Sequence, residues 1–479
     1  MKKGIGSSVL GYFRKLFATV MLLVLSAISC TYYQSDSTDT HGSYNPNIDI
    51  SEALTTEQYD QYTSLFTGNL SERIDSVFTR FRKHHGFRGG LLVGYKGIQV
   101  YNNVYGKADY HDKIAINRQM PFQLASVSKQ FTAVSIMMLA ERGLIDYKSK
   151  VNEYIPEFPY PRISIKQLLN HTSGLPNYMW LLEHKWENAD RNPTNEDVIE
   201  LLAKYQTSLY FTPGRKYDYS NTGYAVLASV VERISGKAFP DFVQENIFIP
   251  LAMENSFIYT SDPNRDLSDI VRGHYHRYRR FYRIGESVHD GVYGDKGVYS
   301  TAADLFKWDQ ALYDGSLLTE NTLEQAFTKV KVRRREYPYG FGFRLKEVDG
   351  KKVVYHTGLW EGFRTNLMRY IEDKNTIIVL NNTNYKNNNS LIRKIEQILD
   401  MPVDNSFTRE VLNVAFEKGV YHSILHFQRK QAQDPNIKID LRKILEVADY
   451  LSSIEKPILS NQALNLYEAF VNTIPSESV

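Results

Sequence analysis

The chain has 479 residues, of which 42% are hydrophobic and 23% charged, and this composition is typical of a globular protein with a large core. The formal net charge is only +3, so no global electrostatic field selects nucleic acid or an anionic membrane as a partner. The single cysteine, Cys30, excludes an intramolecular disulfide and argues against thiol catalysis.

Residues 1–30 have the features of a targeting segment. A basic start precedes an apolar run at residues 16–28, which is too short to span a bilayer but is typical of a signal peptide. The run ends in LSAISC, which resembles the lipobox of bacterial lipoproteins, where the cysteine, here Cys30, carries lipid. We therefore expect an exported lipoprotein, anchored to a membrane at Cys30 and facing the periplasm or the cell surface, with residues 31–69 as a flexible tether and linker. The alternative is an incidental thiol in a discarded leader.

Residues 70–402 show the helix and strand signals of one mixed α/β domain. An amphipathic stretch at 74–84 predicts a helix, and strand patterns at 90–95 and 98–105 flank a turn signal, which indicates a hairpin. A buried helix is predicted at 126–143, because its apolar residues recur at helical spacing and a glycine stands where it should stop. The section that follows is mostly helical, with helices predicted at 198–205, 222–234 and 302–313.

Strand signals return near the end of this domain. They lie at 339–345, 352–355, 364–370 and 376–381, before a helix at 390–399. The predicted fold class is α/β, with an antiparallel sheet that is assembled from both ends of the domain, flanked by helices, and interrupted by an inserted, mostly helical domain.

Residues 403–479 form a helical C-terminal extension in this prediction. Helix-like runs lie at 410–418, 421–430, 441–451 and 461–472. The end of the extension faintly resembles a tetratricopeptide repeat, but fewer than three repeats fit. We therefore expect the extension to pack on the larger domain or to offer a docking face to another protein.

The first motif with chemical meaning is SVSK, from Ser126 to Lys129. A spacing of three residues on a helix places the hydroxyl and the ammonium group on one face, within reach of each other. Burial would lower the pKa of Lys129 and let a neutral amine take the hydroxyl proton, while the helix start would favour a developing oxyanion. The pattern alone is weak, because it recurs from Ser453 to Lys456. The alternative is a capping serine with a solvated lysine.

The second motif is YSN, from Tyr219 to Asn221. A phenol held near Lys129 would share the proton transfer, and the amide of Asn221 would hold a carbonyl group of the substrate. Asn221 also stands where a helix is predicted to begin, so a simple N-cap is the alternative.

The third motif is HTG, at the end of a predicted strand. It comprises His356, Thr357 and Gly358, and Leu359 follows it. A glycine there would let a substrate approach the strand edge. The main-chain N–H of Leu359 would then give a second donor to the oxyanion.

With these motifs in order, the chain resembles the serine β-lactamase-like and penicillin-binding superfamily, nearest the branch of class C β-lactamases, DD-peptidases, D-aminopeptidases and esterases. The resemblance covers about residues 70–400 and rests on FQLASVSKQFTA at 122–133, LLNHTSGLP at 168–176, and the segments 217–224, 297–305 and 356–366. It implies a β-lactamase/transpeptidase-like fold, in which neither a cofactor nor a metal ion is expected.

The resemblance also implies roles for individual residues. Ser126 would be the acylated nucleophile, and Lys129 and Tyr219 the acid/base pair. Asn221 and the HTG segment with its following residue would position the substrate. Which of Lys129 and Tyr219 is the base stays open.

The third motif departs from the Lys-Thr-Gly that lactamases and transpeptidases of this type usually show. His356 replaces a fixed positive charge, and histidine is mostly neutral near pH 7, so we expect weaker or pH-dependent carboxylate recognition and less efficient β-lactam hydrolysis. The predicted function is acyl-enzyme hydrolysis, at Ser126, of D-amino-acid-containing peptides such as cell-wall fragments, or of related amides or β-lactams. The alternatives are an esterase on the same scaffold and a penicillin-binding or sensing lipoprotein without turnover.

Three other features have simpler interpretations. Basic and aromatic residues alternate at 274–283 as in a two-faced hairpin, and we expect no nucleic acid as a partner. His171 is expected to be a buried, hydrogen-bonded histidine rather than a catalyst. Asp295 and Lys296 precede a glycine, and a solvated loop is expected there rather than a wall of the pocket.

Overall fold

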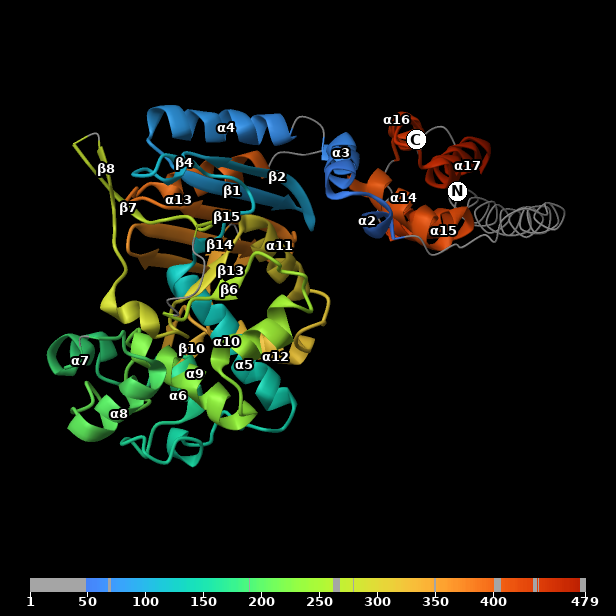
Figure 1. Cartoon of the computed structure of the whole chain (residues 1–479). Coiled ribbons are helices and arrows are strands. Elements are labelled where there is room, and N and C mark those ends of the chain that lie inside the picture. Colours follow the sequence, from blue (N-terminus) through green and yellow to red (C-terminus); the bar gives the residue numbers. More distant parts are fainter. Residues whose placement is uncertain are drawn as a thin grey trace, which may run out of the picture.

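The computed structural model describes residues 49–67, 70–188, 190–261, 268–278, 280–348, 350–399, 406–433, 437 and 439–473. Figure 1 shows a large α/β unit with a smaller group of helices beside it. The leader and Cys30 lie outside the described residues, so the lipid anchor stays a prediction. Within the described ranges, no helix combines the length and the apolar character that crossing a membrane requires.

A six-stranded antiparallel sheet forms the centre of the large unit, as the sequence predicts. The strand order is β12-β13-β14-β15-β1-β2, so strands from the two ends of the unit meet where β1 pairs with β15. The strands are β1 (Gly89–Tyr95), β2 (Ile98–Tyr105), β12 (Arg344–Val348), β13 (Lys351–Trp360), β14 (Phe363–Tyr370) and β15 (Asn375–Asn381). β1 and β15 are buried along their whole lengths, which accounts for their largely apolar sequences.

Helices cover both faces of this sheet. They are α4 (Leu70–His84), α13 (Asn388–Leu399), α5 (Lys129–Glu141) and α11 (Ala302–Ala311). α4 and α13 pack on each other and on one face, while α11 packs on β1 and β15 from the other. The core of this second face continues into the inserted section, where Phe131 of α5 stacks on Trp308 of α11 with the ring centroids 4.2 Å apart. This continuous core fixes the position of α5.

The inserted section lies between β2 and β12 in the chain. Its helices are α6 (Ile165–Leu169), α7 (Tyr178–Lys185), α8 (Asn195–Tyr205), α9 (Asn221–Ser235), α10 (Phe239–Val243) and α12 (Glu320–Ala326), with short turns η1 (Ala125–Ser128), η2 (Val151–Glu153), η3 (Gln244–Phe248) and η4 (Val288–Gly291). α9 contacts α5, α6, α8 and α10 and is therefore central.

Short strands accompany these helices. They are β3 (Lys107–Asp109), β4 (Ile114–Ala115), β5 (Phe122–Gln123), β6 (Phe257–Ile258), β7 (His274–Arg277), β8 (Arg280–Arg283), β9 (Val298–Ser300), β10 (Val330–Val332) and β11 (Arg335–Tyr337). β5 and β6 both pair with β9. β7 and β8 form the projecting hairpin in Figure 1, which confirms the prediction for residues 274–283.

Helices from both ends of the chain form the smaller group in Figure 1. They are α2 (Ile50–Ala53), α3 (Thr56–Thr67), α14 (Ser406–Lys418), α15 (Val420–Gln433), α16 (Leu441–Ser453) and α17 (Pro457–Thr473). They share one apolar core, and the Tyr62 hydroxyl donates to Asn413 at 2.6 Å across it. The flexible tether predicted for 31–69 is therefore wrong for residues 50–67, because their apolar side chains find partners at the distant end of the chain. The C-terminal helices pack chiefly on one another and on α3, and α3 contacts β2 and α4.

Two predicted boundaries shift. The strand expected at 339–345 begins only at Arg344, because the preceding residues turn against α12, where the Phe341 N–H donates to the Ala326 carbonyl at 3.0 Å. The helix expected from Ser126 begins at Lys129, after the turn η1.

Candidate active site

Ser126 lies in the tight turn between β5 and α5. Ala125, just before it, has a left-handed φ of 51°, an uncommon conformation for a residue with a side chain and one that is found at functional sites. Every residue from Met120 to Leu139 is buried except Ser126, which is partly exposed. The turn therefore presents one hydroxyl to solvent from an otherwise buried segment.

Lys129 lies directly behind this hydroxyl. Its Nζ donates to Ser126 Oγ at 3.1 Å and to the main-chain carbonyl of Asp295 at 2.7 Å. Burial lowers the pKa of Lys129 to about 7, while the Asp295 carboxylate raises this pKa and the Arg344 charge lowers it further. The burial that the sequence interpretation requires for this lowering is present, since Lys129 has no exposed surface. A neutral amine is thus available near pH 7 to accept the Ser126 proton.

Tyr219 lies against the same ammonium group, with its ring centroid 5.0 Å from Lys129 Nζ. Burial raises the pKa of the phenol above its ordinary value, and Ser126 and Arg344 partly oppose this rise. The hydroxyl approaches Ser126, but no hydrogen bond of good geometry fixes it there. At neutral pH the phenol is therefore protonated and suited to donate a proton.

Asn221 is the first residue of α9. Ser220 is the N-cap of this helix, because its Oγ accepts from the Gly223 N–H at 3.2 Å, so the capping interpretation of Asn221 is wrong. The Oδ1 atom of Asn221 is buried and has no hydrogen-bond partner among the described residues. An amide oxygen left open in the same segment as Tyr219 is suited to a polar group of a substrate.

Gly358 brings β13 against the turn that carries the nucleophile. A Cβ at this position would lie 2.2 Å from the Leu124 carbonyl oxygen and 2.1 Å from Thr365 Oγ1. The glycine is thus required for the contact between β13 and η1, a role that the sequence interpretation, which assigned it to substrate access, did not foresee.

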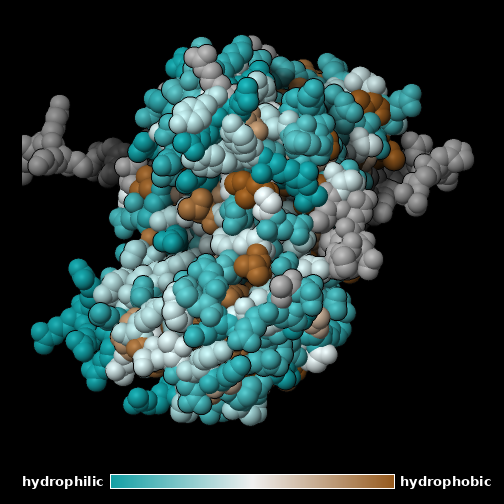
Figure 2. Space-filling model, turned by 60° about the vertical axis from the view of Figure 1, so that its left-hand side comes forward, coloured by the Kyte–Doolittle hydropathy of each residue, from teal (hydrophilic) through white to brown (hydrophobic). Residues whose placement is uncertain are grey.

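Leu359, the next residue along β13, is 60% exposed. Thr357, on the other side of Gly358, is partly exposed. Figure 2 shows apolar residues in the hollowed band between the upper part of the large unit, which contains the sheet, and the lower part, which contains the inserted helices.

His356 lies in the interior, with no exposed surface. Its Nδ1 lies 2.8 Å from the Thr357 carbonyl, which only accepts, so Nδ1 carries the proton and Nε2 accepts from the Tyr339 hydroxyl at 3.2 Å. Burial, followed by the charges of Arg344 and Lys129, lowers the pKa of His356 well below its usual range. His356 is therefore neutral, and both ring nitrogens are engaged with protein groups.

His171 is also buried, and its Nδ1 accepts from the Ser220 N–H at 3.1 Å. Its ring centroid lies 4.3 Å from that of Tyr219. Burial, together with the charge of Lys129, lowers its pKa well below the usual range. The expected structural role is confirmed, since His171 supports the YSN segment as a neutral, hydrogen-bonded residue.

Arg344 is a residue of this site that the sequence patterns do not reveal. It opens β12, lies opposite Tyr355 of β13, and places its guanidinium 5.0 Å from the Tyr219 ring centroid. Its Nε is buried and has no hydrogen-bond partner in the described part of the chain. The arginine belongs to no recognisable motif, and only the pairing of β12 with β13 brings it to the site.

The loop at Asp295 and Lys296 is not solvated, contrary to expectation. Asp295 is 1% exposed and Lys296 3%, because α7 and the end of β13 cover the loop. Lys296 Nζ donates to the Tyr178 hydroxyl at 2.8 Å and lies 5.0 Å from the Trp360 ring centroid. Periodicity within the loop carries no sign of these distant covering residues.

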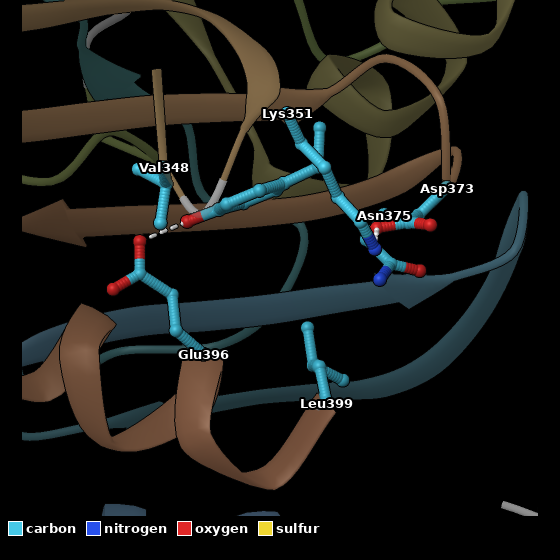
Figure 3. Close-up of a pocket in the computed structure, with 7 residues that line it drawn as sticks. Val348, Lys351, Asp373, Asn375, Glu396 and Leu399 are labelled. Carbon is cyan, nitrogen blue, oxygen red and sulfur yellow. Dashed lines mark hydrogen bonds and ion pairs between the residues drawn. The ribbon is translucent and has the colours of Figure 1, made fainter. Parts of the chain in front are cut away.

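A second hollow lies at the opposite end of β13 from Gly358 (Figure 3). It is lined by Val348, Lys351, Tyr370, Asp373, Asn375, Glu396 and Leu399. Lys351 pairs with Asp373 at 2.7 Å, and Tyr370 donates to Glu396. These polar groups engage one another, and no predicted site residue lies there. Among the described residues, no group of three His, Cys, Asp or Glu side chains is placed to hold a metal ion.

Comparison with known proteins agrees with this geometry. The family model described as beta-lactamase matches residues 74–400. Penicillin-binding protein 4* of Bacillus subtilis (strain 168) is 34% identical over 352 residues, which cover 69% of this chain and 76% of that protein. A D-aminopeptidase of Cereibacter sphaeroides (strain ATCC 17029) is 26% identical over 318 residues, which cover 65% of this chain but only 59% of that protein.

A solved structure shares the fold. The D-amino acid amidase of Ochrobactrum anthropi SV3, in complex with L-phenylalanine amide, superposes with a TM-score of 0.60 at 21% identity, covering 69% of this chain and 99% of the amidase. The predicted fold class and family resemblance are confirmed. The chain belongs to the beta-lactamase family and is a serine hydrolase of the β-lactamase, D-peptidase and esterase type.

Proposed function

We propose that the protein is an acyl-enzyme hydrolase in which Ser126 attacks the carbonyl carbon of D-amino-acid-containing peptides or related amides. The observation that carries the proposal is the contact of Ser126 Oγ with a buried lysine at 3.1 Å, whose pKa is about 7. An ordinary lysine is almost fully protonated at neutral pH, whereas about half of the molecules are free base when the pKa is near 7. This supports Lys129 as the general base and Tyr219 as the proton donor.

The chemistry then follows in balanced steps. Lys129 takes the Ser126 proton as Oγ bonds to the carbonyl carbon, and the carbonyl electron pair moves onto oxygen, which the main-chain N–H groups of Ser126 and Leu359 stabilise. When this tetrahedral intermediate collapses, the C–N bond breaks and the leaving amine takes a proton from the Tyr219 phenol. Lys129 then reprotonates the phenol. Water then attacks the ester, gives its proton to the same base, and the acid product leaves as Ser126 regains its proton.

Arg344 supports substrates that carry a free carboxylate near the scissile bond. The neutral, buried His356 supplies no positive charge, whereas the guanidinium of Arg344 lies beside Tyr219, and its Nε has no hydrogen-bond partner among the residues that the structure describes. Arginine binds carboxylates through a planar pair of donors. Similarity to proteins named penicillin-binding protein 4* and D-aminopeptidase supports D-configured peptides of this kind, such as cell-wall fragments, as the substrate class.

We further propose that the protein is exported and anchored to a membrane by lipid at Cys30. The apolar run and the LSAISC sequence support this placement, which suits wall-derived peptides. Incorporation of a labelled fatty acid that is lost in Cys30→Ala tests the anchor, and equal labelling of that variant would contradict it.

The activity is tested with D-amino-acid amides, muropeptides, p-nitrophenyl esters and nitrocefin. We expect hydrolysis of D-configured amides or peptides that disappears in Ser126→Ala. Hydrolysis of short acyl esters alone would favour the esterase, and labelling by a fluorescent penicillin without turnover would favour a binding lipoprotein. Turnover that persists in Ser126→Ala would contradict the proposal.

A further inference from the structure

A second buried lysine lies behind the one that contacts Ser126. Lys296 Nζ donates to the Tyr178 hydroxyl at 2.8 Å and to the Val292 carbonyl at 2.9 Å. The Tyr178 hydroxyl in turn donates toward the Asp295 carboxylate, whose oxygens lie 3.3 and 3.2 Å away. Lys296 Nζ is also 3.6 Å from Asp295 Oδ1. This chain of donors fits a protonated Lys296 paired with an ionised Asp295.

Asp295 connects this pair to the reactive lysine. Its main-chain carbonyl accepts from Lys129 Nζ at 2.7 Å, and its carboxylate raises the pKa of that amine. Lys129, Asp295 and Lys296 are all at most 3% exposed, so water screens their charges weakly. An unbalanced carboxylate here would stabilise the protonated form of Lys129 and remove the base.

Other charged and titratable groups face the two lysines from neighbouring elements. Those that interact with Lys129 or lie against it are Arg344, His171, His356, Tyr219 and Tyr224. Those that interact with Lys296 or lie against it are Asp290, His289 and Tyr178. Asp290 Oδ1 accepts from Trp360 Nε1 at 2.7 Å. Within the described ranges, Lys296 is the cation that lies within ion-pair distance of the Asp295 carboxylate.

We propose that Lys296 is a positioning residue for the reaction, which balances the charge of Asp295 and so keeps Lys129 in its neutral, proton-accepting form. The inference rests on the proposed role of Lys129 as the base. Burial, with a smaller contribution from the charge of Lys129, lowers the pKa of Lys296, and the Asp295 and Asp290 carboxylates oppose this lowering because they stabilise the charged form. In this arrangement Lys296 stays charged and balances the Asp295 carboxylate, and Lys129 can therefore be neutral.

The test follows the rate at which a fluorophosphonate labels Ser126 as a function of pH. In the unchanged protein the rate is expected to rise around pH 7, where Lys129 loses its proton. Lys296→Met removes the cation but keeps a side chain of similar length. The Asp295 carboxylate then raises the pKa of Lys129, so the midpoint of the labelling rate should shift to higher pH by about one unit. Asp295→Asn removes the anion and leaves the main-chain acceptor in place, so the midpoint of the labelling rate should shift to lower pH. The double variant returns close to the original midpoint.

Lys307→Met is the matched control. Lys307 pairs with Asp304 at 3.2 Å, but its side chain is 45% exposed, so the pH profile should not move. Thermal unfolding shows which variants are folded. If Lys296→Met does not fold, the downward shift of Asp295→Asn and its reversal in the double variant carry the test.

Two outcomes separate the inference from the proposed function. A common midpoint in the unchanged protein and in the folded charge variants overturns the role of Lys296 and leaves the nucleophile and base in place. Labelling that persists in Ser126→Ala overturns the proposed function itself.

Discussion

Lys129 donates a hydrogen bond to the main-chain carbonyl of Asp295, a residue 166 positions later in the chain. The two residues come from different parts of the fold, since Lys129 opens α5 and Asp295 precedes β9. Because the acceptor is a main-chain oxygen, an isosteric change such as Asp295→Asn leaves it in place. The loop therefore supports the lysine mechanically, while its side-chain charges adjust the affinity of that lysine for a proton.

Replacement of the nucleophile should remove activity without loss of the fold. We expect Ser126→Ala to lower kcat/KM by about a thousandfold or more, because no other hydroxyl takes the place of Oγ. The variant should unfold at nearly the same temperature, since the site is partly exposed. Ser453→Ala is the control, because that serine ends α16 in the second SxxK pattern and is exposed. Equal activity of the two variants would contradict the assignment.

The pH dependence should report the titration of Lys129. The neutral amine is the active form, and burial lowers its pKa to about 7, so kcat/KM should rise as the pH increases through 7 and fall below it. Lys129→Arg should be inactive at every pH from 5 to 9, because a guanidinium keeps its proton. An acid limb near pH 4 would instead point to a carboxylate, and the lysine assignment would then fail.

Arg344 should affect binding more than chemistry. We expect Arg344→Gln to raise KM by about tenfold for peptides that end in a free carboxylate, since one charge-assisted hydrogen-bonded pair is lost. The amidated form of the same peptide should lose much less. Loss of the Arg344 charge should also move the acid limb to higher pH, because this charge adds to burial in lowering the pKa of Lys129. Equal effects on both peptides would show that the guanidinium does not contact the carboxylate.

Gly358 should be sensitive to a single added methyl group. Alanine there would meet the Leu124 carbonyl at 2.2 Å, so β13 and the nucleophile turn must separate. We expect Gly358→Ala to lower the free energy of unfolding by about 1–3 kcal/mol and to lower kcat. Gly285→Ala is the matched control, because a Cβ there has no neighbour within 4 Å. Chemical denaturation measures both, and an unchanged Gly358→Ala would refute the packing argument.

The sequence predicts the parts of this site that depend on local spacing. The separation of Ser126 and Lys129, the helix at α9 and the strands β13 to β15 all follow from short-range patterns, and the structure has them. Local patterns could not predict the roles of Arg344, Asp295 and Lys296, because these roles depend on residues from elsewhere in the chain that cover them or pair with them. The helices at 50–67 were not predicted for the same reason, since their packing partners lie in α14 and α16. Burial that arises from distant contacts leaves little trace in a local pattern.

The union of α2 and α3 with α14 to α17 has a consequence for the order of folding. The large unit lies between two parts of the smaller one in the chain, so α2 and α3 are synthesised before α14 to α17, and their apolar faces stay uncovered until those helices have been made. Leu466 and Phe470 of α17 belong to the same core as Ile50 and Tyr62. A chain that is shortened or cleaved before α17 would therefore expose the apolar faces of α2 and α3. Loss of α17 would therefore lower the stability of α2 and α3 as well, and chaperones and proteases act on chains whose stability is lowered in this way.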